Sequence, residues 1–416
     1  MKFGMKTNSL RYKANKQVYM FLCYTFLSYL ALAAFYDVLL SIYYKALGFQ
    51  EDFIGNVIAV RTLLVGLGSV PAGVLAHRLG RRNVIIAGII LSGTGYMGLL
   101  FFGDYSAILV SAAINGFGTA ISFVTDVPLL SENSDGGTRI DALSLNFISV
   151  NAAYIVGSYL AGQLPELLNY PEVISIKYTL LAFTVIQFAS FIPLLKVANK
   201  TSINAGPVAK SYFALLRTKK LVYILCYKIF LGIGSGLVVP FFSLYVVHKF
   251  SVGTSKVGLI LACSQAATII GSAFVPYLSR RFSNVAVVLF CIVLSVPFLL
   301  TITVSRSVFI IGLCFFIRYA LMNMSTPADQ AITMELVGEE ERSMFNSIIC
   351  FLLYAAKGIS TSAAGFLMRY ISYDFPYYIA AVLYSLAALS FAGAFFLPEG
   401  STAGSKSDIS HHKSSL

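Results

Sequence analysis

Five ionisable side chains interrupt long apolar stretches of this chain: Asp37, Arg61, Lys228, Arg318 and Lys357. Such groups are costly in apolar surroundings and usually face a cavity or a partner. Asp37 and Arg61 each lie roughly 10 to 12 Å, by helical rise, from the same end of their segments, which predicts that they are neighbours. Either they form an ion pair that stabilises the fold, or their protonation or separation is coupled to function, since a carboxyl can switch its charge and a guanidinium cannot.

The other three cations, Lys228, Arg318 and Lys357, have no acid at comparable depth in their half of the chain. Arg318 and Lys357 lie roughly 15 to 20 Å from the ends of their segments, which is too far for their side chains to reach water easily. An excess of buried cations predicts a cavity for an anion such as a phosphate, carboxylate or sulfonate. In the alternative interpretation, the two lysines lose their protons on burial and the cavity suits apolar compounds.

Residues for other chemistry are missing from the sequence. The six cysteines all lie inside apolar runs, where a thiol is usually a packing group, and none has the spacing of a metal site or a disulfide. The predicted spans contain no pair of histidines, and no Ser/His/Asp or Cys/His arrangement and no GxxxxGK[ST] phosphate loop is found. We therefore expect no catalytic residue, no metal and no cofactor.

The segments that position these charges are long enough to cross a membrane. The chain of 416 residues is 57% hydrophobic and only 12% charged, with a mean hydropathy of +0.79, values that are too apolar for a soluble protein. Because a span needs roughly 20 residues, the sequence predicts an all-α membrane protein. Its twelve predicted spans are 18–44, 53–76, 83–103, 106–130, 141–164, 178–195, 221–247, 255–279, 284–304, 308–333, 344–369 and 377–397.

The charge of the connections predicts the orientation. Lysine and arginine gather in residues 1–17, 77–82 and 196–220, whereas 104–105 and 165–177 are nearly free of them. Cations are retained in cytoplasmic loops, so both termini should face the cytoplasm of a cell whose cytoplasmic membrane holds the chain. Because the cations gather in these segments, we explain the net charge of +12 by contact with the membrane surface and exclude nucleic acid as a partner.

The two halves of the chain repeat each other. An offset of 203 residues places Leu75 on Leu278 (278 − 75 = 203) and Arg78 on Arg281. The register needs no gap, and its other identical pairs include Gly55/Gly258, Gly68/Gly271, Asp126/Asp329, Glu132/Glu335, Arg139/Arg342 and Gly162/Gly365. Such duplication is typical of transporters. The predicted parts are a tail (1–17), a six-helix bundle (18–196), a linker (197–220), a second six-helix bundle (221–397) and a disordered tail (398–416).

The loop between the second and third spans carries a motif. Its sequence from Gly73 to Arg82, GVLAHRLGRR, resembles the GxLADRxGRR motif of the major facilitator superfamily, with His77 where the family has Asp. The resemblance implies two pseudo-symmetric six-helix bundles that this loop helps to lock together on the cytoplasmic side. The implied gate comprises Gly73, His77, Arg78, Gly80, Arg81, Arg82, Asp126, Glu132, Arg139, Arg280, Arg281, Asp329, Glu335 and Arg342. In this gate we expect Arg78 and Arg281 to make contacts with the acids Asp126, Glu132, Asp329 or Glu335. His77 is either a solvated loop residue or a pH sensor.

Two other marks of the family are changed. Ala112 stands where the fourth-span motif has Arg, and the fifth-span antiporter motif is reduced to Gly157 and Gly162 without its proline. These departures argue against proton-coupled drug antiport of the familiar type, and they leave the implied fold unchanged.

The sequence therefore predicts a secondary active transporter that moves a small solute by alternating access. The excess of cations favours an anionic solute, and Asp37 favours coupling to a proton gradient or to that of another ion. The expected partners are the substrate, the coupling ion and the lipid bilayer, and the chain is expected to act as a monomer. Alternatives on the same fold are a multidrug efflux antiporter and a flippase for lipids or lipid-linked head groups. Polytopic membrane enzymes and non-transporting receptors or scaffolds are alternatives from other classes.

Overall fold

The computed structural model describes residues 16–134, 139–199, 219–338 and 342–396, and within these ranges the chain is helical with no strand. Twelve helical segments are long and apolar enough to cross a membrane, as the sequence predicts. The predicted disordered tail, most of the N-terminal tail and most of the linker lie outside the described residues.

The first half of the chain forms six spans from nine helical pieces. These are α1 (Lys16–Leu32), the π-helix η1 (Ala33–Leu39), α2 (Leu40–Ala46), α3 (Glu51–Leu79), α4 (Arg81–Phe101), α5 (Tyr105–Glu132), α6 (Arg139–Leu167), α7 (Glu172–Ala189) and α8 (Phe191–Leu194).

The second half repeats this order. Its pieces are α9 (Lys219–Val238), the 3₁₀ turn η3 (Val239–Phe241), α10 (Phe242–Phe250), α11 (Thr254–Arg281), α12 (Asn284–Val304), α13 (Val308–Met324), α14 (Thr326–Glu335), α15 (Arg342–Tyr370) and α16 (Phe375–Phe396).

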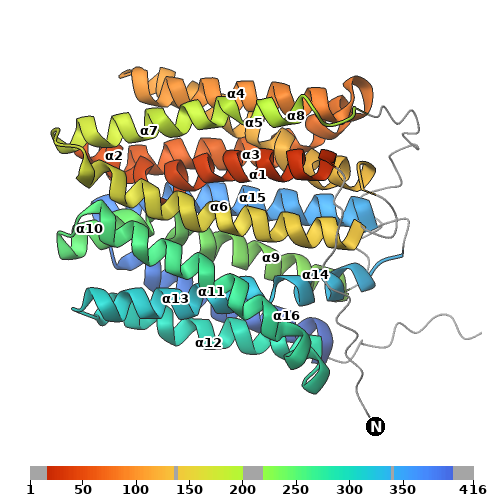
Figure 1. Cartoon of the computed structure of the whole chain (residues 1–416). Coiled ribbons are helices and arrows are strands. Elements are labelled where there is room, and N and C mark those ends of the chain that lie inside the picture. The colour runs from red at the N-terminus through yellow and green to blue at the C-terminus, as the bar shows by residue number, and fades with distance from the viewer. Residues whose placement is uncertain (1–15, 135–138, 200–218, 339–341, 397–416) are drawn as a thin grey trace, which may run out of the picture.

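Figure 1 shows most of the first half above and most of the second half below, with α6 and α15 between them in this view and with all helices running across it. We call the end that holds the start of α1, with α8 and α14, the proximal end, on the right of Figure 1. The opposite end, which holds α2 and α10, is the distal end. Each bundle consists of six consecutive spans, and the chain passes from one bundle to the other once, between α8 and α9.

The spans differ from their predicted bounds mainly at their ends. The sixth span begins at Glu172, six residues before the predicted start at 178, because its first two turns carry Glu172 and Lys177 and so resemble a loop in sequence. The predicted tenth span is divided at Ser325 into α13 and α14, and α14 begins with a proline in its first turn. Proline lacks an N–H group and is favoured at such a start.

The halves approach most closely at two crossings near the distal end. Where α3 crosses α15, a Cβ atom added to Gly55 would lie 3.2 Å from Cα of Gly365, and where α6 crosses α11, one added to Gly162 would lie 2.8 Å from Cα of Gly258. The sequence repeat relates these contacts, because 258 − 55 and 365 − 162 both equal 203. Two identical glycine pairs therefore form two equivalent crossings, as expected for bundles related by pseudo-two-fold symmetry.

Candidate functional site

Asp37 lies in a break of the first span. The seven residues Ala33–Leu39 form a π-helix between the α-helical parts of this span, a rare geometry that is frequent at functional sites. At the repeat-related position (37 + 203 = 240) Pro240 lies in the 3₁₀ turn of the seventh span. Among the described residues no hydrogen bond or ion pair engages the Asp37 carboxylate. The first span of each half is thus interrupted at the same depth, beside the interface of the two bundles.

Arg61 of α3 is held by neutral groups. Its guanidinium carbon lies 3.9 Å from the centre of the Tyr36 ring, and its Nε donates a 3.3 Å hydrogen bond to Oδ1 of Asn115. The Tyr36 hydroxyl donates to the same oxygen at 3.1 Å. Nη2 of Arg61 is buried without a described partner. Arg61 acts electrostatically on Asp37, so the two are neighbours as predicted. Within the part of the chain that is described they do not form the direct ion pair that is one of the two alternatives for their role.

A cavity of about 260 Å³ in the second half contains Arg318 and Lys357. Arg318 is only 2% exposed, and its Nη2 donates a 2.8 Å hydrogen bond to the Tyr384 hydroxyl. Nε of Arg318 is buried without a described partner. Lys357 lines the same cavity, and of the charged groups that act on Asp37 it acts most strongly. The cavity therefore contains two cations of the second half, and one of them, Lys357, acts on a carboxylate of the first half.

Lys228 departs from its predicted role. Its ammonium group forms an ion pair with the carboxylate of Asp329, so the prediction that no acid neutralises it is wrong. Asp329 lies six residues from the end of α14, so its carboxylate is at the same depth in the bundle as the ammonium group of Lys228 of α9. Neither residue lines the cavity of Arg318. The cations left for a ligand are Arg61, Arg318 and Lys357.

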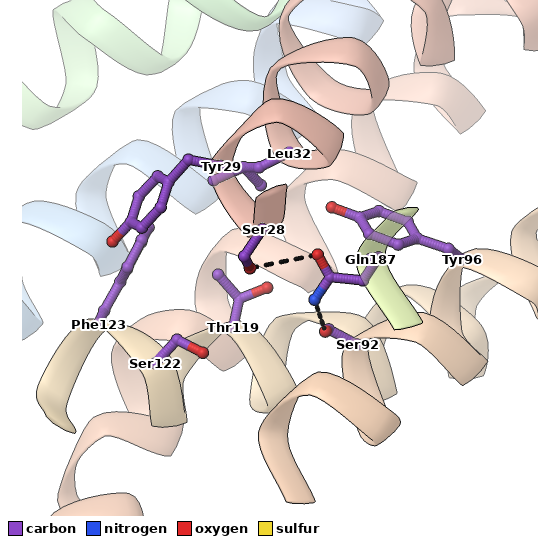
Figure 2. Close-up of a pocket in the computed structure, with 9 residues that line it drawn as sticks. All are labelled: Ser28, Tyr29, Leu32, Ser92, Tyr96, Thr119, Ser122, Phe123 and Gln187. Carbon is purple, nitrogen blue, oxygen red and sulfur yellow. Dashed lines mark hydrogen bonds between the residues drawn. The ribbon is translucent and has the colours of Figure 1, made fainter. Parts of the chain in front are cut away.

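The first half contains a small polar pocket, shown in Figure 2. Gln187 lies at its centre, where its amide nitrogen donates to Oγ of Ser92 at 2.8 Å and its oxygen accepts from Oγ of Ser28 at 3.2 Å. The pocket has room of about 20 Å³, which is enough for about one water molecule. Its other lining residues are Tyr29, Leu32, Tyr96, Thr119, Ser122 and Phe123.

The two cavities are related by the repeat and differ in chemistry. Leu32 and Thr119 of the first cavity correspond to Ser235 and Met322 of the second at the offset of 203. Asn115, which holds Arg61, corresponds to Arg318 (115 + 203 = 318). One half thus offers hydroxyl and amide groups and the other offers cations. Phe123 and Tyr354 separate them, with ring centres 6.5 Å apart.

The predicted gate residues lie at the proximal end, with different partners from those expected. Arg81 forms a 2.6 Å ion pair with Glu132, and Nη1 of Arg82 donates to the carbonyl oxygen of Val197 at 3.1 Å. Gly80 has a φ of 82° and lies against Asn199, so no other residue fits easily there.

The remaining gate residues make few described contacts. Nε of Arg342 donates to the carbonyl oxygen of Met334 at 3.1 Å, and Gly73 packs on α5 through Val124. The side chain of His77 is not described. Arg78, Arg139, Arg280, Arg281 and Glu335 are exposed. The structure does not place Arg78 or Arg281 against the acids that we expected them to bind, and the gate role of this set stays a prediction.

The sequence reasoning missed a second set of contacts, at the distal end, which joins the two halves directly. Arg369 forms a 2.6 Å ion pair with Asp52, and the hydroxyl groups of Ser41 and Ser243 are hydrogen-bonded at 3.0 Å. Glu51 pairs with Lys45 at 2.6 Å and accepts a hydrogen bond from Tyr373 across the halves. These charges lie at the ends of spans, where they resemble ordinary loop charges, and only their opposite signs at the distal ends could have indicated the contact.

A family model matches both halves of the chain, over residues 21–233 and 224–415, and its description is Major Facilitator Superfamily. The chain belongs to the major facilitator superfamily. Its fold, with twelve candidate spans in two bundles, is that of this superfamily, and the family and fold are those of transporters rather than enzymes.

Known proteins resemble it at low sequence identity. The quinolone resistance protein NorA of Staphylococcus aureus (strain MSSA476) is 21% identical over 332 residues, which cover 79% of this chain and 84% of that protein. The uncharacterized MFS-type transporter YttB of Bacillus subtilis (strain 168) is 32% identical over 96 residues, which cover 23% of this chain and 24% of that protein.

Solved structures share the fold. The nucleoside transporter NupG aligns with a TM-score of 0.75 at 13% identity, over 92% of this chain and all (100%) of that one. A D-xylose–proton symporter aligns with a TM-score of 0.74 at 13% identity, over 92% of this chain and 98% of that one. At such identities the likeness shows the fold and leaves the substrate open.

Proposed function

We propose that this chain is a secondary transporter that carries a small anionic solute across the cell membrane by alternating access, coupled to a proton at Asp37. The observation that carries the proposal is Arg318, which is almost completely buried, has an unbonded Nε and shares its cavity with Lys357. A buried guanidinium without an acid is costly unless a ligand supplies the negative charge. Its planar fork suits the two oxygens of a carboxylate or phosphate.

Asp37 supports the coupling. It faces Lys357 from the other half without a direct hydrogen bond, and Lys357 and Arg61 are the charges that act on it. A charged Asp37 offsets part of the Lys357 charge, whereas a protonated Asp37 leaves that charge to an anion. The charge state of Asp37 thus changes the affinity of the cavity for the substrate, and the substrate changes proton binding by the same factor.

The orientation follows from the cations of the sequence. The proximal end carries Arg78, Arg81, Arg82, Arg280 and Arg281 at the ends of α3, α4 and α11, which supports a cytoplasmic proximal end with both termini on that side. One chain contains both bundles and all residues that line the cavity, which supports a monomer as the working unit.

Anion binding by the purified protein tests the proposal. We expect thermal stabilisation by anionic metabolites, screened as a panel of phosphates, carboxylates and sulfonates. Arg318→Gln and Lys357→Gln should each lower the affinity for such an anion by about tenfold or more, as for loss of a charged hydrogen bond. Lys256→Gln is the matched control, because Lys256 is exposed on α11 outside this cavity. Absence of stabilisation by every anion in the panel would contradict the proposal.

Multidrug export is the second candidate, and the similarity to NorA along 332 residues favours it. The same variants separate the two functions. A cavity for lipophilic cations should bind them in the wild type, and should bind them equally well or better after Arg318→Gln, because that change removes a repelling charge. Tight binding of a lipophilic cationic dye without any response to anions would select export of such compounds.

A further inference from the structure

Asp126 is a buried carboxylate that the cavity of Arg318 does not explain. It lies on α5, six residues before the proximal end of that helix at Glu132, and is 3% exposed. Its oxygens accept hydrogen bonds from the hydroxyl groups of Tyr24 at 2.9 Å and Tyr29 at 3.3 Å. No described cation pairs with it. A buried carboxylate held only by neutral donors is costly and tends to take up a proton.

The repeat provides an internal comparison. Asp329 is the counterpart of Asp126 (126 + 203 = 329), and Tyr227 is the counterpart of Tyr24 (24 + 203 = 227). Asp329, however, forms an ion pair with Lys228, and the residue of the first half that corresponds to Lys228 is Thr25 (228 − 203 = 25). The same carboxylate therefore occurs twice, once with a permanent cation and once without one.

The charged groups around Asp126 do not replace that lysine. Arg78 of α3 and Arg139 of α6 are exposed, and Arg81 of α4 is engaged by Glu132. Nη1 of Arg82 of α4 donates to the carbonyl oxygen of Val197, its backbone N–H donates to Asn199, and Asp141 of α6 is exposed. The groups that bear on Asp126 directly are the two tyrosines of α1. Its charge state is thus set by protonation and not by an ion pair.

The pocket of Figure 2 shares residues with the surroundings of this carboxylate. Tyr29, which donates to Asp126, also lines that pocket, as does Ser122, one turn before Asp126 on α5. The pocket has room for about one water molecule. A proton that reaches the Tyr29 oxygen from the pocket can take the place of the hydroxyl proton, which moves to the carboxylate. The new carboxyl O–H then donates to the Tyr29 oxygen.

We propose that Asp126 is a proton-binding site of this transporter, separate from the cavity of Arg318 and Lys357, and that its repeat mate Asp329 is a permanently charged structural copy. The inference about proton binding stands without the proposed substrate. Only the use of the bound proton to drive transport rests on the proposed function.

Infrared difference spectroscopy of the purified full chain in lipid, recorded between high and low pH, tests the proposal. A protonated carboxyl group has a C=O stretching band that a carboxylate lacks. We expect a band from a buried carboxyl in the wild type, its loss in Asp126→Asn, and its retention in Asp329→Asn. Retention of every such band in Asp126→Asn would overturn the proposal.

A reciprocal exchange makes the test independent of a single variant. Lys228→Thr should turn Asp329 into a second protonating carboxyl and add a band, and Thr25→Lys should pair with Asp126 and remove the original one. Thermal unfolding and size-exclusion chromatography identify variants that do not fold. If Lys228→Thr folds and adds no band, the ion pair is not what distinguishes the two carboxylates, and the proposal fails.

Transport measurements in vesicles then separate the two claims. If transport depends on the proton gradient and Asp126→Asn leaves this dependence and every infrared band unchanged, the Asp126 site is wrong and the proposed function survives. If the band belongs to Asp126 but transport ignores the gradient, the site is right and the proposed coupling is wrong.

Discussion

At the scale of single residues, this protein depends on which of its charged side chains have partners of opposite charge. Lys228 has Asp329, Arg81 has Glu132 and Arg369 has Asp52, whereas Arg318 relies on a tyrosine hydroxyl and Asp37 has no described partner. Uncompensated ionisable groups in a membrane are typical of substrate and ion pathways. The residues with incomplete contacts are therefore the ones on which we base the function.

Replacement of Asp37 by Asn tests the coupling at this scale. The amide keeps the shape of a protonated carboxyl and cannot lose the proton, so a cycle that requires both charge states should stop. We expect Asp37→Asn to abolish accumulation against a gradient while downhill exchange of substrate continues at a rate within about tenfold of the wild type. Transport in vesicles with and without an imposed proton gradient measures both.

The control for this variant is Asp104→Asn, since Asp104 caps α5 through a 3.1 Å hydrogen bond in an exposed loop. An Asp37→Asn variant that accumulates substrate like the wild type, with unchanged pH dependence, would reduce Asp37 to a packing residue.

At the scale of helices, the glycine crossings set how closely the halves approach. Gly162 of α6 meets Thr254 and Gly258 of α11, with the carbonyl oxygen of Thr254 2.7 Å from the position of an added Cβ. Since backbone atoms cannot move aside as a flexible side chain does, a larger residue must push the helices apart. The close approach also allows the Thr254 hydroxyl to donate to the carbonyl oxygen of Gly162 at 2.9 Å.

Replacement of Gly162 by Val is therefore expected to destabilise this conformation by about 1–3 kcal/mol, the usual effect of overpacking. The melting temperature should fall, and cysteines introduced at the distal end should react faster with a polar thiol reagent. Gly103→Val is the matched control, because nothing lies within 4 Å of a Cβ added at Gly103. Equal behaviour of the two variants would show that the crossing is not tightly packed.

At the scale of the whole molecule, the described polar contacts between the halves lie at the distal end. They include Asp52–Arg369 at 2.6 Å and the hydrogen bond from the backbone N–H of Ser255 to Glu166 at 2.9 Å. The described ion pairs of the proximal end, Arg81–Glu132 and Lys228–Asp329, stay within one half. The conformation is thus one in which the distal end is closed by direct contacts between the bundles.

A charge exchange at the distal end tests this closure. Arg369→Asp should place two carboxylates together, weaken the closed state and increase labelling of the distal end, with a change roughly below tenfold because the pair is partly exposed. Asp52→Arg combined with Arg369→Asp restores opposite charges and should return labelling toward the wild-type value. Failure of the double variant to recover, with both proteins folded, would show that the pair does not hold the ends together.

The sequence alone determined the twelve spans, the duplication and the family, because hydrophobic length, a constant offset of 203 and a loop motif are properties of residues in order. It also predicted that Lys228 and Arg318 are buried, whereas Asp37, Arg61 and Lys357 are half-buried. Only the tertiary structure decided how these charges pair, since partners such as Lys228 and Asp329 are 101 positions apart. The break around Asp37 likewise depends on packing between helices, because Ala33–Leu39 has no residue that interrupts a helix. Contacts across the bundle interface follow from the mutual placement of two halves, which a one-dimensional pattern does not contain.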